Sequence, residues 1–251
     1  KAFEKLIKYS TGKYIAFCDQ DDIWHLDKVE RMVEVLKNHP EIKTLASSFN
    51  FVDGQGKPFS IEQKKGYANQ NLLHKDVINE IERVDLSLVK ITNFSQGCCM
   101  AVRKEEVEIF LKNTQSKYPH DWELNLIAAM QDGCYFYNVP LIDYRIHDKN
   151  TIGLDDVIHN SHKELMKNRT IKRLNYIDEE IELLNYLKRI NIGYEYNKEY
   201  VENHILYSKD RKKYIKNKSF FSLIVMYLKG KYKGYGSFKT FVGDLCSIVY
   251  K

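Results

Sequence analysis

The feature that most constrains the fold is a short apolar run that ends abruptly in acidic residues. Residues 14–18 are mostly apolar, and Asp19, Asp21 and Asp22 follow within four positions. This pattern predicts a buried strand that carries acidic side chains at its C-terminal end, where open α/β sheets bind their ligands. Carboxylates in this arrangement suit a hard divalent cation, which in turn suits a phosphate-bearing substrate. A solvated turn that precedes a helix is the alternative interpretation.

Strand and helix patterns alternate through the first 153 residues. Helices are predicted at 1–9, 26–38, 74–84, 105–112 and 122–130, and strands at 13–18, 44–52, 98–102, 134–139 and 142–144. The sequence Asp-Gly-Gln-Gly at 53–56 predicts a turn that closes a hairpin. We therefore expect an α/β domain over residues 1–153, and a helical, basic extension over residues 154–251.

The extension begins with long charged stretches at 157–190 and 197–216, which predict helices. The ten residues from Ser219 to Leu228 are mostly apolar and are flanked by lysines. They are too few to span a bilayer, which takes about 20 residues. They are typical of a helix that lies in a membrane interface, and a helix packed in a protein core is the alternative.

The distribution of charge along the chain indicates which partners the C-terminal part could bind. The net charge is +5, yet between Lys209 and Lys239 ten Lys and Arg accompany a single acid, which gives +9 there and −4 elsewhere. Such a tail indicates anionic lipid, a polyanionic substrate or nucleic acid as partner, or a solvated basic helix.

The five cysteines form no C-x-x-C pair, and their odd number argues against a disulfide framework. We expect reduced thiols and a cytoplasmic protein.

Two later segments fit the first acidic cluster. His120 and Asp121 lie at the start of a predicted helix. Asp121 is either the N-cap of that helix or a general base that faces a cleft. After the last predicted strand, Arg145 and His147 supply a cation and an imidazole, and the imidazole could share a metal with the carboxylates.

Together these segments resemble the family 2 glycosyltransferases of the GT-A fold, particularly bacterial rhamnosyltransferase-like members. The matching segments are Gly12–Trp24, Gln96–Met100, His120–Trp122 and Tyr144–Asn150, in the family's order. The resemblance implies a metal-dependent enzyme of bacterial cell-surface polysaccharide synthesis. Its donor would be a UDP- or dTDP-sugar, and its acceptor a hydroxyl group on a glycan or a lipid-linked molecule.

The resemblance also implies roles for individual residues. Asp19 and Asp21 look like the family's DxD pair, and Asp21 with His147 would bind Mg²⁺ or Mn²⁺. Asp121 would be the catalytic base, and a single base without a nucleophilic carboxylate implies inversion at the anomeric carbon. The resemblance also assigns Asp22, Gly97 and Cys98 to the donor site. It assigns His120 and Trp122 to the acceptor side.

The chain departs from the family pattern at its start. A GT-A domain normally opens with a strand–helix–strand unit that holds the nucleobase and ribose, whereas eighteen residues precede Asp19 here. We therefore expect a fragment of a longer enzyme, or an inactive form. The competing functions are another phosphate-ester enzyme and a non-catalytic module that binds polyanions or membrane. Nucleic acid is not the expected partner, since no RNA-binding signature is present. We expect peripheral attachment to the inner face of the cell membrane.

Overall fold

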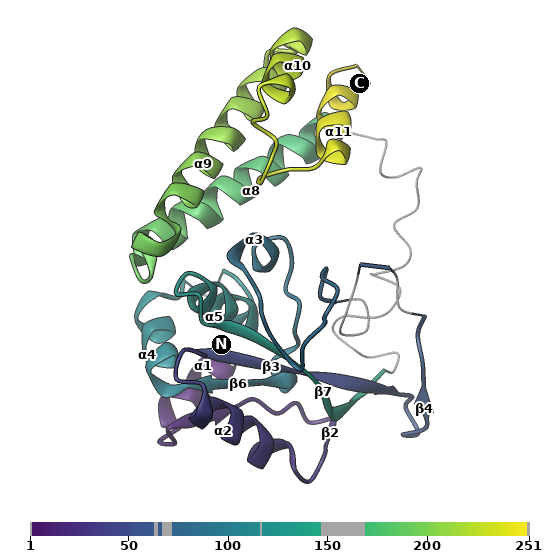
Figure 1. Cartoon of the computed structure of the whole chain (residues 1–251), viewed down its shortest axis with the longest axis vertical. Coiled ribbons are helices and arrows are strands. Elements are labelled where there is room, and N and C mark those ends of the chain that lie inside the picture. The colour runs from purple at the N-terminus through teal and green to yellow at the C-terminus, as the bar shows by residue number, and fades with distance from the viewer. Residues whose placement is uncertain (1, 63–64, 67–71, 116, 147–168, 250–251) are drawn as a thin grey trace. The chain divides into compact units, whose positions relative to one another are not determined.

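The computed structural model describes residues 2–62, 65–66, 72–115, 117–146 and 169–249. The chain divides into two compact units, Lys1–Gly153 and Leu154–Lys251, which we call the α/β unit and the helical unit (Figure 1). The α/β unit is a mixed sheet flanked by helices, and the described part of the helical unit consists of helices. The predicted α/β fold with a C-terminal helical extension is confirmed.

The α/β unit contains seven strands and five helices within its described residues. The strands are β1 (Tyr14–Ala16), β2 (Ile23–Trp24), β3 (Thr44–Val52), β4 (Pro58–Phe59), β5 (Ile81–Arg83), β6 (Met100–Arg103) and β7 (Cys134–Arg145). The helices are α1 (Ala2–Tyr9), α2 (Lys28–Asn38), α3 (Leu86–Val89), α4 (Lys104–Asn113) and α5 (His120–Ala129), and a 3₁₀ turn spans Gly97–Cys99.

The order of the strands brings distant segments to one edge of the sheet. The order is β1-β6-β3-β7-β2, with β4 beside β3 and β5 beside β7. The central strands β3 and β7 are parallel, and β6 runs antiparallel to both β1 and β3. The end of β1 therefore meets the start of β6, where the backbone N–H of Phe17 donates to the carbonyl of Met100 at 3.3 Å. The loop after β1 and the turn before β6 become neighbours.

The central strand β3 lies in the core of the α/β unit. In β3 every residue except Asn50 is buried, as expected for a central strand covered on both faces. One side packs on α2 through Met32, Leu36 and Leu45. Another cluster joins β3 to the turn before β6, and it contains Phe49, Phe51, Cys98, Cys99 and Ile142.

The region predicted as a helix at 74–84 is instead irregular and leads into β5. Glu82 explains the difference, because its carboxylate accepts hydrogen bonds from the backbone N–H groups of Ile78 and Asn79 and from the Lys75 ammonium. Such local side-chain bonds compete with the helical pattern of backbone bonds. The polar residues of this segment thus stabilise a loop.

Three predicted strands need correction as well. Cys98 and Cys99 lie in the 3₁₀ turn rather than in β6. The strands predicted at 134–139 and 142–144 are one strand, β7, whose register against β3 shifts between Tyr137 and Pro140. The register shifts again between Pro140 and Asp143, and Pro140, which pairs with Ser48, explains the irregularity because it has no N–H to give to the ladder.

The helical unit is built on a pair of long antiparallel helices. Its elements are α8 (Arg169–Ile190), α9 (Tyr194–Lys216), α10 (Phe220–Leu228) and α11 (Phe238–Val249). Their core contains Ile177, Tyr207, Ile215, Leu223, Met226, Tyr232 and Phe241. The helix predicted at 157–190 is described only from residue 169 onward. Within the described ranges, no helix is long and apolar enough to cross a membrane.

Candidate active site

The candidate site lies at the sheet edge where β1 ends. The loop that carries Asp19, Asp21 and Asp22 meets the Gly97–Cys99 turn there, since β1 and β6 are antiparallel neighbours. The start of α5 joins them, because a Cβ added to Gly97 would lie 3.1 Å from His120 Nε2. Segments about 80 to 100 residues apart in the sequence therefore share one location.

Asp19, Asp22 and Cys98 present one potential ligand atom each, all within 4.8 Å of one another. The backbone N–H of Arg145 donates to Asp22 Oδ1 at 3.0 Å. The other oxygen, Asp22 Oδ2, is buried and has no hydrogen-bond partner among the described residues. Leaving such an oxygen unsatisfied in a buried position is costly, so the position fits a bound cation or a ligand donor.

The electrostatics of Asp19 agree with a cation-binding role. Burial raises the pKa of Asp19, and the nearby charges of Asp22 and Asp21 raise it further. Asp121 adds to the same effect, which places its carboxylate within electrostatic reach of the cluster. The accumulated negative charge would be relieved by a divalent cation.

The sulfur of Cys98 is not a suitable ligand for a hard cation. Its hydrogen bond with Cys99 and its burial raise the pKa of the Cys98 thiol, so the thiol stays neutral. It serves instead as a hydrogen-bond partner that lowers the pKa of Asp19. The oxygens of Asp19 and Asp22 fit Mg²⁺ or Mn²⁺, which prefer carboxylate ligands.

Lys28 and Arg145 supply positive charge beside the acidic loop. Lys28 is fully buried, its Nζ donates to the carbonyl of Cys98 at 2.6 Å, and it lies 4.8 Å from the centre of the Trp24 ring. Burial lowers the pKa of Lys28, while the cysteines and Asp22 oppose that shift. Arg145 Nε donates to the backbone carbonyl of Asp21 at 2.8 Å, which fixes the loop.

Lys28 was not predicted as a site residue, although the sequence carries a signal for its burial. Leu26 and Val29, which have the spacing of an apolar face at the start of the predicted helix, are both exposed. The buried face instead runs through Lys28, Met32 and Leu36, at intervals of four residues. A lysine at the first position of that face is the pattern that would have identified it.

Asp121 and His120 approach the cluster from the start of α5. The helix begins at His120 with Pro119 in the cap position, so the alternative that Asp121 caps this helix is wrong. The ring of His120 stacks on Phe3, with centroids 4.2 Å apart. Burial lowers the pKa of His120, and its Nε2 is buried without a hydrogen-bond partner among the described residues. Neutral His120 therefore keeps one ring nitrogen available at the site.

The side chain of Trp122 is fixed by contacts with other residues of the α/β unit. Its indole Nε1 donates to the carbonyl of Val89 at 2.6 Å, and its ring packs edge-on against Tyr118. The side chain is half-buried. These contacts anchor α5 to α3, and the role of Trp122 toward an acceptor stays a prediction.

The structure thus brings together most of the predicted site residues: Asp19, Asp22, Gly97, Cys98, His120 and Asp121. The predicted metal ligands were Asp21 and His147. Asp21 lies in the same loop but outside the group that could share one ion, and His147 lies outside the described residues. The metal assignment therefore stays a prediction, with Asp19 and Asp22 as the geometrically grouped carboxylates.

Comparison with known proteins bears on the first part of the chain. Residues 1–108 match the family model described as Glycosyl transferase family 2. No curated protein matches the sequence. The matched segment contains Asp19, Asp22, Gly97 and Cys98, and it ends within α4, before Asp121. The match supports a family 2 glycosyltransferase and, more generally, glycosyl transfer from a nucleotide-sugar donor to an acceptor.

Proposed function

We propose that this protein is a metal-dependent, inverting glycosyltransferase. It would move a sugar from a UDP- or dTDP-linked donor to a hydroxyl group of a glycan or lipid-linked acceptor in bacterial cell-surface polysaccharide synthesis. The observation that carries the proposal is the Asp22 carboxylate, which is oriented by Arg145 and has a buried oxygen without a hydrogen-bond partner among the described residues, next to Asp19. The family match of residues 1–108 supports the same reaction class.

The acidic loop would bind the diphosphate end of the donor through a divalent cation. Asp19 and Asp22 would hold Mg²⁺ or Mn²⁺, with Asp21 and His147 as further candidate ligands. The bound ion would supply Lewis-acid stabilisation of the charge that develops on the leaving diphosphate. Lys28 and Arg145 hold the loop and the Cys98 turn in place, so that the oxygens are positioned before the donor arrives.

On the other side of the scissile bond, Asp121 would take the proton of the acceptor hydroxyl. The backbone N–H of Trp122 donates to Asp121 Oδ1 at 2.8 Å, and Asp121 Oδ2 would accept the proton. The hydroxyl oxygen then attacks the anomeric carbon as the bond to the diphosphate breaks, and the configuration inverts. The absence of a side chain at Gly97 leaves room beside His120 and Asp121.

The test compares nucleotide binding with sugar transfer in one series of variants. Wild-type protein should show a rise in melting temperature with UDP or dTDP that depends on Mn²⁺. Asp121→Asn should keep this rise and lose transfer by about 10²- to 10⁴-fold. Glu105→Gln is the matched control, because Glu105 occupies the second position of α4 as Asp121 does in α5.

Each outcome of this series is decisive. Metal-dependent stabilisation together with loss of transfer only in Asp121→Asn supports the proposal. Stabilisation that does not require the metal contradicts the role of Asp19 and Asp22. Near-normal turnover in Asp121→Asn, measured as nucleoside diphosphate released, contradicts the assignment of the base.

The proposed place of reaction is the cytoplasm, at the inner face of the cell membrane, where a lipid-linked acceptor would be presented. Exposed lysines around α10 support this location, because anionic headgroups attract basic segments.

A further inference from the structure

The helical unit has an apolar surface that its own core does not use. Helix α10 is fixed in that core by Leu223 and Met226, which are both buried. Its opposite side carries Phe221, which is 81% exposed, and Leu228, which is 77% exposed. Because α10 is anchored on one side, its exposed residues form a fixed face.

Helical spacing makes this face continuous. Phe221, Val225 and Leu228 lie at intervals of four and three residues, and each is exposed. Phe238, at the start of α11, is 64% exposed, and its ring lies 6.0 Å from that of Tyr227. The apolar surface therefore extends from α10 to the beginning of α11. We call these four residues, Phe221, Val225, Leu228 and Phe238, the apolar face.

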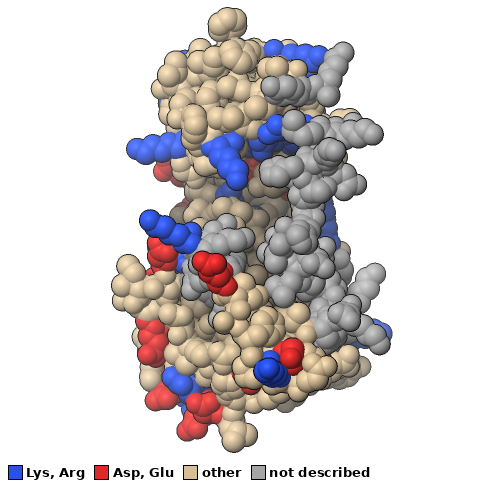
Figure 2. All heavy atoms as spheres, turned by 90° about the vertical axis from the view of Figure 1, so that its right-hand side faces the viewer, with Lys and Arg blue, Asp and Glu red and all other residues tan. Residues whose placement is uncertain are grey.

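The segment that carries the apolar face is rich in lysine. Six lysines and no acids occur from residue 216 to residue 243. They are all exposed, and they are Lys216, Lys218, Lys229, Lys231, Lys233 and Lys239. On the face of the helical unit that Figure 2 shows, most of the described surface carries no Lys, Arg, Asp or Glu, and Lys and Arg side chains lie at its margins. An apolar face accompanied by lysines, without acidic residues among them, complements an anionic lipid surface.

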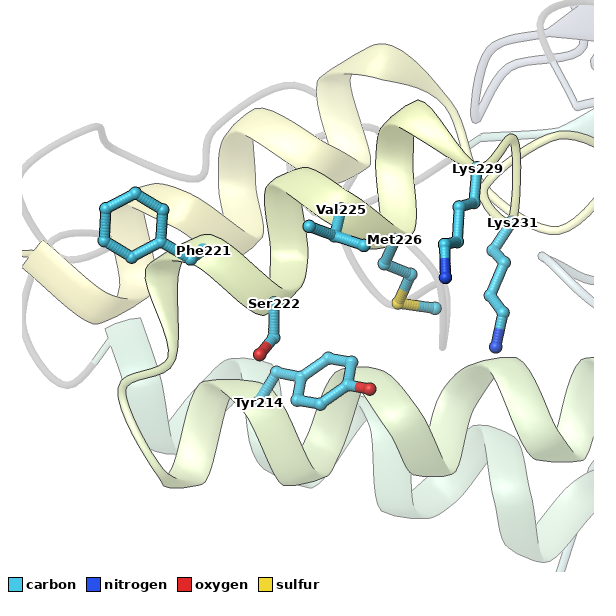
Figure 3. A pocket seen from close by; sticks show the side chains of 7 residues that line it. All are labelled: Tyr214, Phe221, Ser222, Val225, Met226, Lys229 and Lys231. Carbon is cyan, nitrogen blue, oxygen red and sulfur yellow. The ribbon is translucent and has the colours of Figure 1, made fainter.

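A groove between α9 and α10 places two of these lysines close together. The groove has a volume of about 240 Å³ and is lined by Tyr214, Val225 and Met226 among others. Figure 3 shows Lys229 and Lys231 side by side at one end of it and Phe221 near the other. Lys231 pairs with Asp210 at 3.0 Å, whereas Lys229 has no carboxylate at ion-pair distance among the described residues. Apolar walls with an ammonium group at one end fit a lipid phosphate above its acyl chain.

We propose that the apolar face of α10 and α11 docks the protein onto an anionic phospholipid bilayer. Phe221, Val225, Leu228 and Phe238 enter the boundary between headgroups and acyl chains, and the lysines of the same segment contact lipid phosphates. This inference concerns the helical unit alone, and it holds whether or not the α/β unit transfers sugar.

The experiment is flotation of the full chain with two kinds of vesicle. Vesicles of phosphatidylglycerol mixed with phosphatidylcholine should carry the protein upward, and vesicles of phosphatidylcholine alone should carry much less. Added salt should weaken the binding, because lysines contribute to it. Equal binding to both kinds of vesicle, or no binding to either, overturns the proposal.

Matched variants test the apolar face and the lysines separately. Phe221→Ser and Leu228→Ser should each weaken binding by on the order of tenfold, and their exposure means that the fold should be unaffected. Lys229→Gln should weaken it by roughly fivefold. Tyr196→Ser and Lys198→Gln, at exposed positions near the start of α9, are the controls and should bind as wild type does.

A competing polyanion separates lipid from nucleic acid. If single-stranded RNA binds the protein and Phe221→Ser leaves that binding and vesicle flotation unchanged, the basic tail acts through charge alone and the proposal is wrong. If Phe221→Ser and Leu228→Ser lose flotation while thermal unfolding is unchanged, the apolar face is the docking surface.

Discussion

Each unit contains an aspartate with a buried carboxylate oxygen, and the surroundings of the two carboxylates differ. In the helical unit, Asp244 is fully buried and its carboxylate accepts hydrogen bonds from Arg211 Nε at 2.7 Å, Arg211 Nη2 at 3.0 Å and the Tyr232 hydroxyl at 2.8 Å. Arg173 Nε adds an ion pair at 3.1 Å. In the α/β unit, Asp22 receives one backbone hydrogen bond and keeps a buried oxygen that has none among the described residues.

The difference separates a structural carboxylate from one that can bind a ligand. Asp244 is surrounded by donors on both oxygens, so it has little capacity left for a metal or substrate. Asp22 lies near Asp19, which has the same sign of charge, so its surroundings favour an added cation. The same residue type thus stabilises one unit and prepares the other for binding.

The largest effect is expected at Asp244. Asp244→Asn would remove a carboxylate charge that pairs with two guanidinium groups, and among the described residues the almost fully buried Arg211 would keep only its longer ion pair with Glu180 at 3.6 Å. Breaking a buried ion pair from one side costs about 3–5 kcal/mol, so unfolding of the helical unit should shift to much lower urea. Circular dichroism during urea unfolding measures this change. Asp178→Asn, in an exposed ion pair with Lys212, is the control and should change stability by less than about 1 kcal/mol.

A smaller but more informative effect is expected at Asp22. Asp22→Asn should leave metal-free stability unchanged or slightly raised, because it removes repulsion with Asp19 and its amide oxygen can still accept from Arg145. The variant should bind Mn²⁺ at least tenfold more weakly, which isothermal titration calorimetry measures. Asp27→Asn, in the exposed pair with Arg31, should bind Mn²⁺ normally. If Asp22→Asn destabilises the protein as Asp244→Asn does, the contrast between the two centres is wrong.

Sequence reasoning predicted the frame of the α/β unit well. The strand predicted at 44–52, the helix predicted at 26–38 and the hairpin turn at 53–56 come from local signals, and each corresponds to an observed element. The meeting of the acidic loop with Gly97 and Asp121 was predicted only through resemblance to a family. It depends on the antiparallel pairing of β1 with β6, which no local pattern encodes.

Other features escaped prediction because they are set by partners distant in sequence. Lys28 is buried because the carbonyl of Cys98, seventy positions later, receives its ammonium group. The loop in place of the helix at 74–84 is set by the hydrogen bonds of Glu82, which outweigh helix propensity. The hydrogen bonds that satisfy Asp244 could not be predicted from the sequence either, since Arg211 and Tyr232 come from other segments of the helical unit.

Lys28 is expected to affect binding more than stability. Lys28→Met keeps the length of the side chain and removes a buried charge whose pKa burial already lowers, so stability should change by no more than about 1.5 kcal/mol. Loss of the positive charge beside the acidic loop should weaken binding of UDP or dTDP with Mn²⁺ by roughly fivefold. Lys37→Met, at an exposed position of the same helix, is the control. A large loss of stability with unchanged nucleotide affinity would make Lys28 a purely structural residue.

The smallest effect is a dependence of stability on pH that belongs to Asp19. Burial and the neighbouring carboxylates raise its pKa in the folded protein above the usual 3.8. Between these two values the folded state holds a proton that the unfolded state has released, so the free energy of unfolding falls as pH rises through that window. Glu82 acts in the opposite direction, because its hydrogen bond with Lys75 lowers its pKa to about 2, so its contribution is lost as pH falls toward that value.

The contribution of Asp19 is therefore measured as a difference. Asp19→Asn should remove the decrease in stability with rising pH and leave the low-pH loss that Glu82 produces. Saturating Mn²⁺ should remove the same decrease from the wild-type protein, because a bound cation favours the ionised carboxylate. Urea unfolding at several pH values, with and without Mn²⁺, provides both comparisons. If the two proteins keep parallel pH profiles in the absence of metal, Asp19 is as well compensated as Asp244, and the acidic loop has no need of a cation.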